Sequence, residues 1–347
     1  MALWLIRAGK EGEFEQRFLD KGRIYFNWSG LNANLADYPE LGDLYALFES
    51  IYADASQGTT HNWARQAGQF SRWMKIGDWV ALPSKFNPVI HFGKITGGYI
   101  FDENAEDRFQ HHHTVEWFAP DIPRDRFDQD ILYSFGAFLT VCQIQRNNAE
   151  ERVKEMAANG WHVPKTSTAT IEPAAQAEET EARSPIDLET TAKDQISKLM
   201  LAKFKGQGLA ALVKALLEAQ GYTVFMPPEG PDKGVDLLAA PGTLGFGSPR
   251  ICVQVKATDA PVDRPVLDQL IGVMQNFHAQ QGLLVSWSGF KQSVEKERGA
   301  QFFRVRLWNR EDILNGIFAH YDQLPAEIRA EIPLKQIWTL NLPVEES

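Results

Sequence analysis

A stretch without aromatic residues divides this chain of 347 residues into two long parts. The segment 164–185, PKTSTATIEPAAQAEETEARSP, is rich in Ala, Thr, Glu and Pro and has no apolar period. This composition cannot bury a core and is typical of a solvated linker. We therefore expect a domain over 1–163, a flexible acidic linker over 164–190, and a second domain over 191–347.

The composition is that of an ordinary soluble protein, with 44% hydrophobic and 23% charged residues. No apolar run reaches the roughly 18 residues that span a bilayer. The N-terminus, MALWLIRAGKEGEFE, turns acidic early and lacks the apolar stretch of a signal peptide. Cys142 and Cys252 lie far apart in apolar contexts, which favours reduced core thiols. We expect a cytoplasmic protein without a membrane partner.

The net charge of −10 argues against a nucleic-acid partner when it is taken alone. However, residues 195–347 carry 16 Lys and Arg against 16 Asp and Glu, and residues 166–194 carry 2 against 7. A neutral domain can still hold a local basic groove. Charge therefore neither supports nor excludes DNA as a partner.

Apolar periodicity predicts an α/β protein in both parts. In the first part, strands are expected at 3–7, 23–28, 90–95 and 115–118, with helices at 11–21, 41–52 and 131–138. These short elements predict a small mixed α/β barrel. In the second part, the order helix, three strands, helix, strand, helix predicts a mixed sheet flanked by helices.

The stretch 234–256, GVDLLAAPGTLGFGSPRICVQVK, carries the strongest chemical signal. Gln254 and Lys256 are two residues apart in a predicted strand, so they share one face. A hairpin turn at 242–247 would bring Asp236 to the same rim. The Asp236 carboxylate, the Gln254 amide oxygen and the Val255 carbonyl are hard oxygen ligands of the kind that Mg²⁺ binds. Lys256 could position or deprotonate an attacking water and hold a phosphate oxygen.

A simpler interpretation competes with this one. A Gln-x-Lys tripeptide is common and usually marks an edge strand with two solvated side chains. Asp236 could equally be a residue of the hairpin. The spacing by itself leaves both interpretations open.

The run LVKALLEAQGYTV, GPDKGVDLLA, ICVQVK, LDQLIGVMQNFHAQQGLLVSWSGF resembles the catalytic domain of the Mrr-type restriction endonucleases, a branch of the PD-(D/E)xK superfamily. The resemblance covers about residues 205–315. It implies a restriction-endonuclease-like fold, with Asp236 as metal ligand, Gln254 in place of the usual acidic ligand, and Lys256 as catalytic lysine. It also implies a helper role for Asp232, which could be only a turn residue.

The sequence departs from the family pattern in the first helix of this domain. Family members often carry Phe-Glu there, whereas this chain has Leu209 and Ala210. One acidic metal ligand is therefore missing, and Glu218 lies too far along the helix to replace it. Weak metal affinity, or loss of cleavage, follows as an alternative.

Seven of the ten tryptophans lie in residues 1–165. Most such rings fill a core, but two or three could line a slot for an unstacked base. The stretches WLIRAGKEGEFEQRFLDKGRIYFNW and GDWVALPSKFNPVIHFGKITGGY are similar to PUA/EVE-like modules, which precede restriction nuclease domains and are associated with reading modified bases. This resemblance covers about residues 3–145. It suggests a base pocket lined by Trp28, Trp63 and Trp79. It also suggests that Arg7, Lys85 and Lys94 lie near phosphates. Ser29 could donate a hydrogen bond in the pocket, or could equally be a turn residue.

Three consecutive histidines, His111 to His113, cannot all face one metal in a strand or helix. Their flanks predict a loop that enters a strand, and we expect no metal site there.

These observations predict a modification-dependent, type IV-like restriction endonuclease that defends against foreign DNA. Its partners would be Mg²⁺, or alternatively Mn²⁺, and double-stranded DNA, with or without modified bases. A centre that cuts one strand predicts a homodimer on DNA. Two alternatives remain: a protein that binds modified DNA without cleaving it, and a nuclease acting on repair intermediates or RNA.

Overall fold

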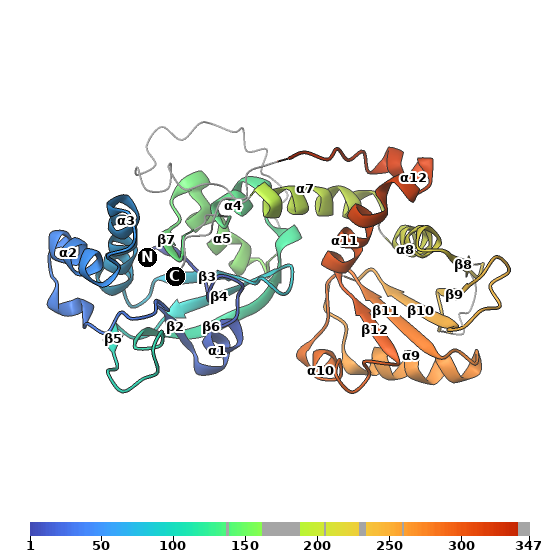
Figure 1. The fold of residues 1–347 in the computed structure, drawn as a ribbon, viewed down its shortest axis with the longest axis horizontal. Helices are drawn as coiled ribbons and strands as arrows, with labels where there is room; N and C mark the ends of the chain where they lie inside the picture. Colours follow the sequence, from blue (N-terminus) through green and yellow to red (C-terminus); the bar gives the residue numbers. More distant parts are fainter. Residues whose placement is uncertain (137–138, 162–187, 205, 229–233, 259, 339–347) are drawn as a thin grey trace. The chain divides into compact units, whose positions relative to one another are not determined.

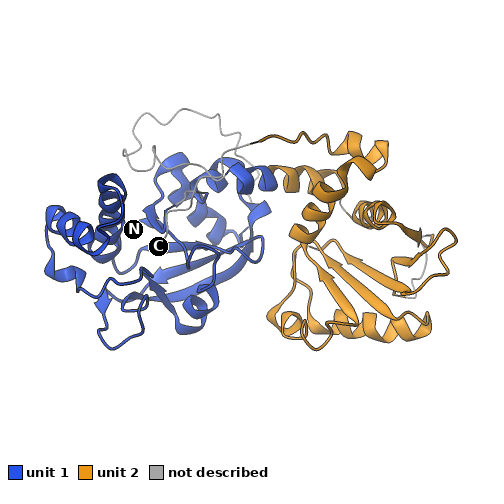
Figure 2. Ribbon diagram, viewed as in Figure 1, with its two compact units in different colours: residues 1–194, 340–347 blue, residues 195–339 orange. Residues whose placement is uncertain are grey.

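The computed structural model describes residues 1–136, 139–161, 188–204, 206–228, 234–258 and 260–338. The chain divides into two compact units, which meet in sequence between Asp194 and Gln195 (Figure 2). Most of the expected linker, up to residue 187, lies outside the described residues. Residues 188–190 are helical, because helix α7 (Leu188–Lys203) begins there. Within unit 1, the buried Arg124 guanidinium donates two hydrogen bonds, of 3.0 and 2.6 Å, to the Asp194 carboxylate on α7.

Unit 1 is built on a seven-stranded mixed sheet (Figure 1). Its strands are β1 (Leu3–Ile6), β2 (Arg23–Tyr25), β3 (Trp79–Pro83), β4 (Val89–Ile95), β5 (Ile100–Phe101), β6 (His111–Pro123) and β7 (Val141–Gln143). Its helices are α1 (Glu15–Lys21), α2 (Leu41–Ile51), α3 (Gln57–Gly68), α4 (Gln129–Ser134) and α5 (Ala149–Ala158). The strand order is β2-β6-β4-β3-β1-β7, and β5 pairs with β6.

Both faces of this sheet are covered. On β1, Trp4 and Ile6 point into a core shared with α2 and α3, whereas Leu3 and Leu5 point into a second core shared with α4 and α5. This strict alternation is the period of a strand whose two faces are both buried. Among the described residues the outer strands β2 and β7 do not pair, so the sheet curls without closing. The small α/β barrel predicted for this part is present as a curled half-barrel sheet with two covered faces.

Helix α3 was not expected from the sequence, because its exposed face is polar and its apolar residues are few. It begins after Ser56, whose side chain accepts a hydrogen bond from the Thr59 N–H. It is held in place by burial of Trp63, Ala64 and Ala67. Tertiary packing, more than helix propensity, decides this element.

Unit 2 is a five-stranded mixed sheet flanked by helices, as predicted (Figure 1). Its strands are β8 (Tyr222–Phe225), β9 (Leu237–Pro241), β10 (Ile251–Lys256), β11 (Gln281–Ser286) and β12 (Val305–Trp308). Its helices after α7 are α8 (Gln207–Ala219), α9 (Arg264–Asn276), α10 (Gln292–Glu295), α11 (Arg310–His320) and α12 (Ala326–Glu331). In the order β12-β11-β10-β9-β8, the first three strands are parallel and β10, β9 and β8 are antiparallel.

The two faces of the unit 2 sheet carry separate cores. Val253 and Leu283 point toward α8 and α11, and Cys252 and Leu284 point toward α9 and α10. Helix α8 ends before Gly221, whose φ of +89° favours glycine. Among the described residues, no helix combines the length and apolarity that crossing a bilayer requires.

Candidate active site

The chemistry-bearing residues of unit 2 meet where β9 begins and β10 ends. Asp236 directly precedes β9, and its backbone N–H donates to the Val253 carbonyl at 2.9 Å. Its carboxylate Oδ2 accepts a hydrogen bond of 2.6 Å from the Val255 N–H. The backbone pairing of β9 with β10 ends at Val253. Beyond that point, the Asp236 side chain takes the place of a backbone acceptor for the next N–H group of β10. This short bond fixes the carboxylate against the backbone of β10.

Gln254 and Lys256 lie on β10 and project from the same face, toward the α9 side. Lys256 is half-buried, whereas Gln254 is only 2% exposed. The Gln254 Oε1 atom has no hydrogen-bond partner among the described residues. An orphaned buried acceptor costs about 1–3 kcal/mol. Other described side chains also carry such atoms, but the Gln254 oxygen lies on the strand whose Val255 N–H holds the Asp236 carboxylate, which makes it a candidate ligand atom.

The Val255 carbonyl faces the same side of β10 as the Asp236 carboxylate. The Lys256 carbonyl accepts from the Trp287 N–H at 3.1 Å, on the β11 side, whereas Val253 and Val255 bond toward Asp236. The N–H and C=O of one strand residue point to the same side. The three oxygen donors predicted from the sequence, which come from Asp236, Gln254 and Val255, therefore lie on neighbouring residues at the start of β9 and the end of β10.

The donor set suits a hard cation. Among the described residues, no group of three His, Cys, Asp or Glu side chains could hold a metal ion, so a zinc-type cluster is not found there. Burial raises the pKa of the nearby Cys252 thiol to about 11, so this thiol stays protonated at neutral pH. One carboxylate with amide and carbonyl oxygens remains, which is a set that Mg²⁺ accepts together with water.

Among the described residues, no additional acidic candidate joins this site. Ala210 is buried in α8 at the position where the family pattern has a glutamate. Glu218 lies at the surface of the same helix, with its Oε1 3.7 Å from the Lys214 Nζ. Asp232 lies outside the described residues. The described site therefore offers Asp236 as its carboxylate.

In unit 1, three of the residues predicted to form a base pocket lie together. The Trp28 and Trp63 rings meet edge to face at 4.8 Å between centroids, and Tyr52 packs edge-on against Trp63 at 5.3 Å. The Tyr52 hydroxyl donates to the Ser29 carbonyl at 2.9 Å. Rings at these separations are in contact, so no base fits between Trp28 and Trp63 in this conformation. The base pocket that Trp28 and Trp63 are expected to line stays a prediction, with the base outside the contact between these two rings.

The other predicted pocket residues lie elsewhere. Trp79 and its register partner Lys94 lie on the opposite face of the sheet, where Trp79 contacts Phe118 at 4.7 Å. Arg7 follows β1 and its N–H donates to Thr140. The Lys85 N–H donates to Glu15 in the loop after β3. The sequence could not separate the two faces, because Trp28 follows β2, Trp63 lies on α3 and Trp79 begins β3.

One buried amide was missed by sequence reasoning. Asn27 is 0% exposed, and its Oδ1 and Nδ2 have no hydrogen-bond partner among the described residues. The Trp28 Nε1 is also buried without a partner in that part of the chain. A polar amide inside the run YFNW was the available signal, because the surrounding strand is otherwise apolar.

The three histidines lie inside β6, not in a loop, and all are buried. They alternate between faces, so His111 and His113 point one way and His112 the other. The Tyr99 hydroxyl donates to His111 Nδ1 at 2.8 Å, and His111 Nε2 donates to the Leu31 carbonyl at 2.8 Å. In this segment β6 pairs with both β2 and β5. These two pairings explain why β6 extends further than the predicted strand.

Comparison with known families assigns the second unit. Residues 201–317 match the restriction endonuclease family described as the Mrr catalytic domain, and residues 4–132 match a domain of unknown function, DUF8426. The chain therefore contains an Mrr-type restriction endonuclease domain, and its enzyme class is endodeoxyribonuclease. The resemblance of the first unit to PUA/EVE-like modules stays a prediction. No curated protein matches this chain.

Three solved structures are distantly similar. The DNA modification-dependent restriction endonuclease AspBHI is 14% identical, with a TM-score of 0.31, over 90% of this chain and 79% of that chain. The MspJI restriction endonuclease in complex with a 27-mer oligonucleotide is 14% identical, with a TM-score of 0.25, over 96% and 80%. AF1548, a protein of unknown function, is 13% identical, with a TM-score of 0.26, over 36% and 77%. These TM-scores are low, so the assignment depends on the family match.

Proposed function

We propose that the chain is a Mg²⁺-dependent, modification-dependent restriction endonuclease that acts against foreign DNA. The observation that carries the cleavage part is the pairing of a fixed carboxylate with an orphaned buried oxygen. Asp236 is held by the Val255 N–H at 2.6 Å, and Gln254 Oε1 has no partner in the described part of the chain. Asp236, Gln254 and the Val255 carbonyl would hold the cation, with Mn²⁺ as the alternative. When bound, the ion supplies Lewis acidity toward a phosphate oxygen and makes water more acidic.

The remaining roles in cleavage are assigned to Val255, Lys256 and Gln254. The Val255 N–H orients the Asp236 carboxylate before any substrate arrives. Lys256, on the same face as Gln254, would hold a phosphate oxygen with its Nζ and move the proton of the attacking water. Burial of Gln254 keeps its amide in one position. Preorganisation of this kind contributes to catalysis because no group must reorient during the reaction.

Unit 1 is the proposed reader of a modified base. Support comes from the aromatic cluster around Trp28 and Trp63 and from the unpartnered, buried Asn27 amide among the described residues. Because the two rings touch, the base would bind beside this cluster, near Ser29, and not between the rings. Trp79, Lys94, Arg7 and Lys85 remain proposed DNA contacts. Since one centre cuts one strand, a homodimer forms on DNA.

The second candidate is a protein that binds modified DNA without cleaving it. The observation that favours it is the buried Ala210, which leaves the described site with one carboxylate. A single carboxylate binds Mg²⁺ weakly compared with a pair.

The test uses the purified full chain, plasmids that differ only in cytosine or adenine modification, and an unmodified branched DNA. Cleavage is measured with Mg²⁺, Mn²⁺ or a chelator, and compared for the wild type, Lys256→Ala and the surface control Lys214→Ala. We expect double-strand cuts in one modified plasmid, with either metal, by the wild type and the control only. Binding of modified DNA without cleavage would support the second candidate. Preferential cutting of unmodified branched DNA would indicate a repair nuclease, and no cutting or binding would remove all three functions.

A further inference from the structure

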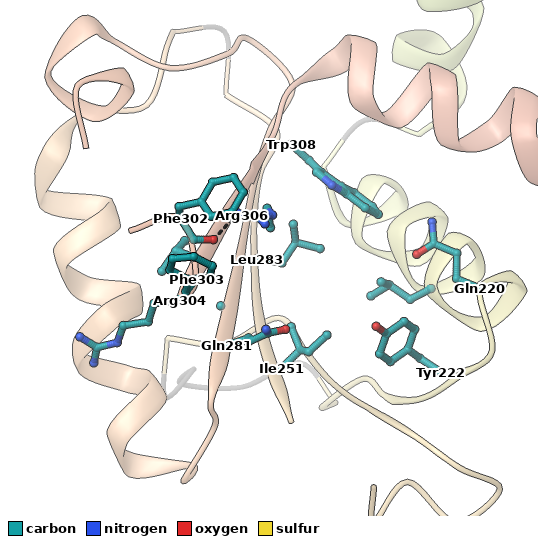
Figure 3. Close-up of a pocket in the computed structure, with 13 residues that line it drawn as sticks. Gln220, Tyr222, Ile251, Gln281, Leu283, Phe302, Phe303, Arg304, Arg306 and Trp308 are labelled. Atoms are coloured by element: carbon teal, nitrogen blue, oxygen red, sulfur yellow. Dashed lines mark hydrogen bonds between the residues drawn. The ribbon is translucent and has the colours of Figure 1, made fainter. Parts of the chain in front are cut away.

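A second pocket lies in unit 2, away from the candidate active site. It has a volume of about 270 Å³ and lies against the α8 side of the sheet, at the starts of β10, β11 and β12 (Figure 3). Ile251, Gln281 and Val305, which begin these strands, contribute to its wall. Gln254 and Lys256 belong to the other end of β10 and project to its other face. The pocket is therefore separate from the proposed catalytic groups.

The wall combines aromatic rings with positive charge. Thirteen described residues line the pocket, among them Tyr222, Phe302, Phe303, Trp308, Arg304 and Arg306, and none of the thirteen is Asp or Glu. Figure 3 shows Tyr222 and Gln220 on one side and Phe302 and Phe303 on the other, with Leu283 between them. The Tyr222 hydroxyl and the Gln220 amide both point toward the strands.

The two phenylalanines are unusually exposed for their type. Phe303 is 88% and Phe302 50% exposed, and their rings meet edge to face at 5.1 Å. The Arg306 guanidinium lies 4.1 Å from the Phe302 ring centroid and also donates to the Phe302 carbonyl. Arg304 extends outward from the rim (Figure 3). Exposed apolar rings held beside cations indicate a surface that binds something flat and negatively charged.

We propose that this pocket binds one nucleotide, either free or within a single strand of DNA. An aromatic wall stacks on a base, as platforms for single-stranded nucleic acids do. The Gln220 and Gln281 amides offer donors and acceptors to the edge of the base. Arg304 and Arg306 supply charge for its phosphate. The volume, near the lower limit for small-ligand pockets, fits one nucleotide and excludes a duplex.

The experiment measures binding separately from cleavage. The full chain carrying Lys256→Ala is titrated with a 2-aminopurine deoxynucleoside monophosphate, and separately with a single-stranded oligonucleotide that contains one 2-aminopurine. Stacking on an aromatic ring quenches the fluorescence of this base. Phe303→Ala and Arg304→Ala are then added to the Lys256→Ala chain. The matched controls are Phe225→Ala, another exposed phenylalanine, and Arg329→Ala, another exposed arginine, neither of which lines the pocket.

We expect the protein to quench the fluorescence of 2-aminopurine. Phe303→Ala should lower the affinity from this titration about 5- to 100-fold, whereas Phe225→Ala should leave the affinity unchanged. Arg304→Ala should weaken binding and reduce its salt dependence, whereas Arg329→Ala should not. Quenching of the free nucleotide assigns a free nucleotide as ligand, and quenching of the oligonucleotide alone assigns a DNA strand. Absence of quenching in both, or equal effects of Phe303→Ala and Phe225→Ala, would overturn the proposal. Because the catalytic lysine is already removed, failure of the cleavage proposal leaves this result intact.

Discussion

Two buried polar side chains, one in each unit, differ in what their polar atoms meet. His111 on β6 accepts a hydrogen bond from the Tyr99 hydroxyl and donates one to the Leu31 carbonyl. The same Tyr99 oxygen accepts from the Leu35 N–H at 3.1 Å, so the chain of bonds is complete. Gln254 on β10 is equally buried, yet its Oε1 has no partner among the described residues.

This difference separates a structural polar group from one that we propose to be functional. A buried polar group with partners contributes to stability, because its bonds replace those lost to water. A buried group without partners lowers stability and is retained where a ligand completes it. By this criterion His111 helps to hold the fold of unit 1, whereas the proposed role of the Gln254 amide is in the reaction of unit 2.

The largest expected effect is on cleavage, from Asp236→Asn. The amide keeps the size of the side chain and can still accept from the Val255 N–H, but it removes the negative charge. We expect cleavage of the modified plasmid to fall at least about a hundredfold, since a lost metal ligand removes several kcal/mol of transition-state stabilisation. Single-turnover cleavage assays measure this. Asp322→Asn, at an exposed site, is the control, and equal activities would exclude Asp236 as a metal ligand.

The next effect is on stability, from His111→Leu. Leucine fills similar space but leaves the Leu31 carbonyl and the Tyr99 hydroxyl without their partner. We expect the free energy of unfolding of unit 1 to fall by about 1–3 kcal/mol. Urea unfolding followed by tryptophan fluorescence measures the change. An unchanged midpoint would contradict the structural role of His111.

Gln254→Leu should do the opposite and sharpens the comparison. The substitution removes an unpartnered buried oxygen and fills the same space with an apolar side chain. The free energy of unfolding should therefore stay equal or rise by up to about 1 kcal/mol. Cleavage should fall at least about tenfold, because one oxygen donor is lost. The same urea and cleavage assays apply. A loss of stability as large as that of His111→Leu would show that Gln254 is structural.

The smallest effect is a pH dependence in unit 1. Burial lowers the pKa of His111 and His113 below the ordinary value of 6.5. A group whose folded-state pKa is depressed contributes stability above its unfolded pKa and loses it as pH falls. The free energy of unfolding should therefore decrease below about pH 6.5. For each histidine, the decrease is at most about 1.4 kcal/mol per pH unit. His111→Leu should reduce this slope, and an identical slope in both proteins would refute the assignment.

Local patterns were enough to predict much of unit 2. Alternation in ICVQVK placed Gln254 and Lys256 on one face, and the glycine-rich hairpin brought the Asp236 end of β9 beside β10. These neighbours are close in sequence, so strand geometry and turn chemistry determine their contacts. The resemblance to the Mrr-type family also predicted that Ala210 lies where family members often carry a glutamate.

Unit 1 was harder, because its contacts join residues far apart in the chain. Periodicity alone predicted neither the open sheet with two covered faces nor helix α3. Trp28 and Trp63 meet although 35 positions separate them in the sequence, whereas Trp79 and Lys94 lie on the other face of the sheet. A composition rich in tryptophan indicates that rings are buried but not which ones touch.

The sequence by itself predicted that Asp236, Gln254 and Lys256 lie together in the endonuclease domain, because alternation and a short hairpin act over a few residues. The tertiary structure decided which polar groups are satisfied. It placed Tyr99 and Leu31 around His111, left Gln254 Oε1 without a partner in the described residues, and gathered the rings of Tyr222, Phe303 and Trp308 around one pocket. These outcomes depend on long-range packing, in which each group's partner comes from a distant segment whose position no local pattern encodes.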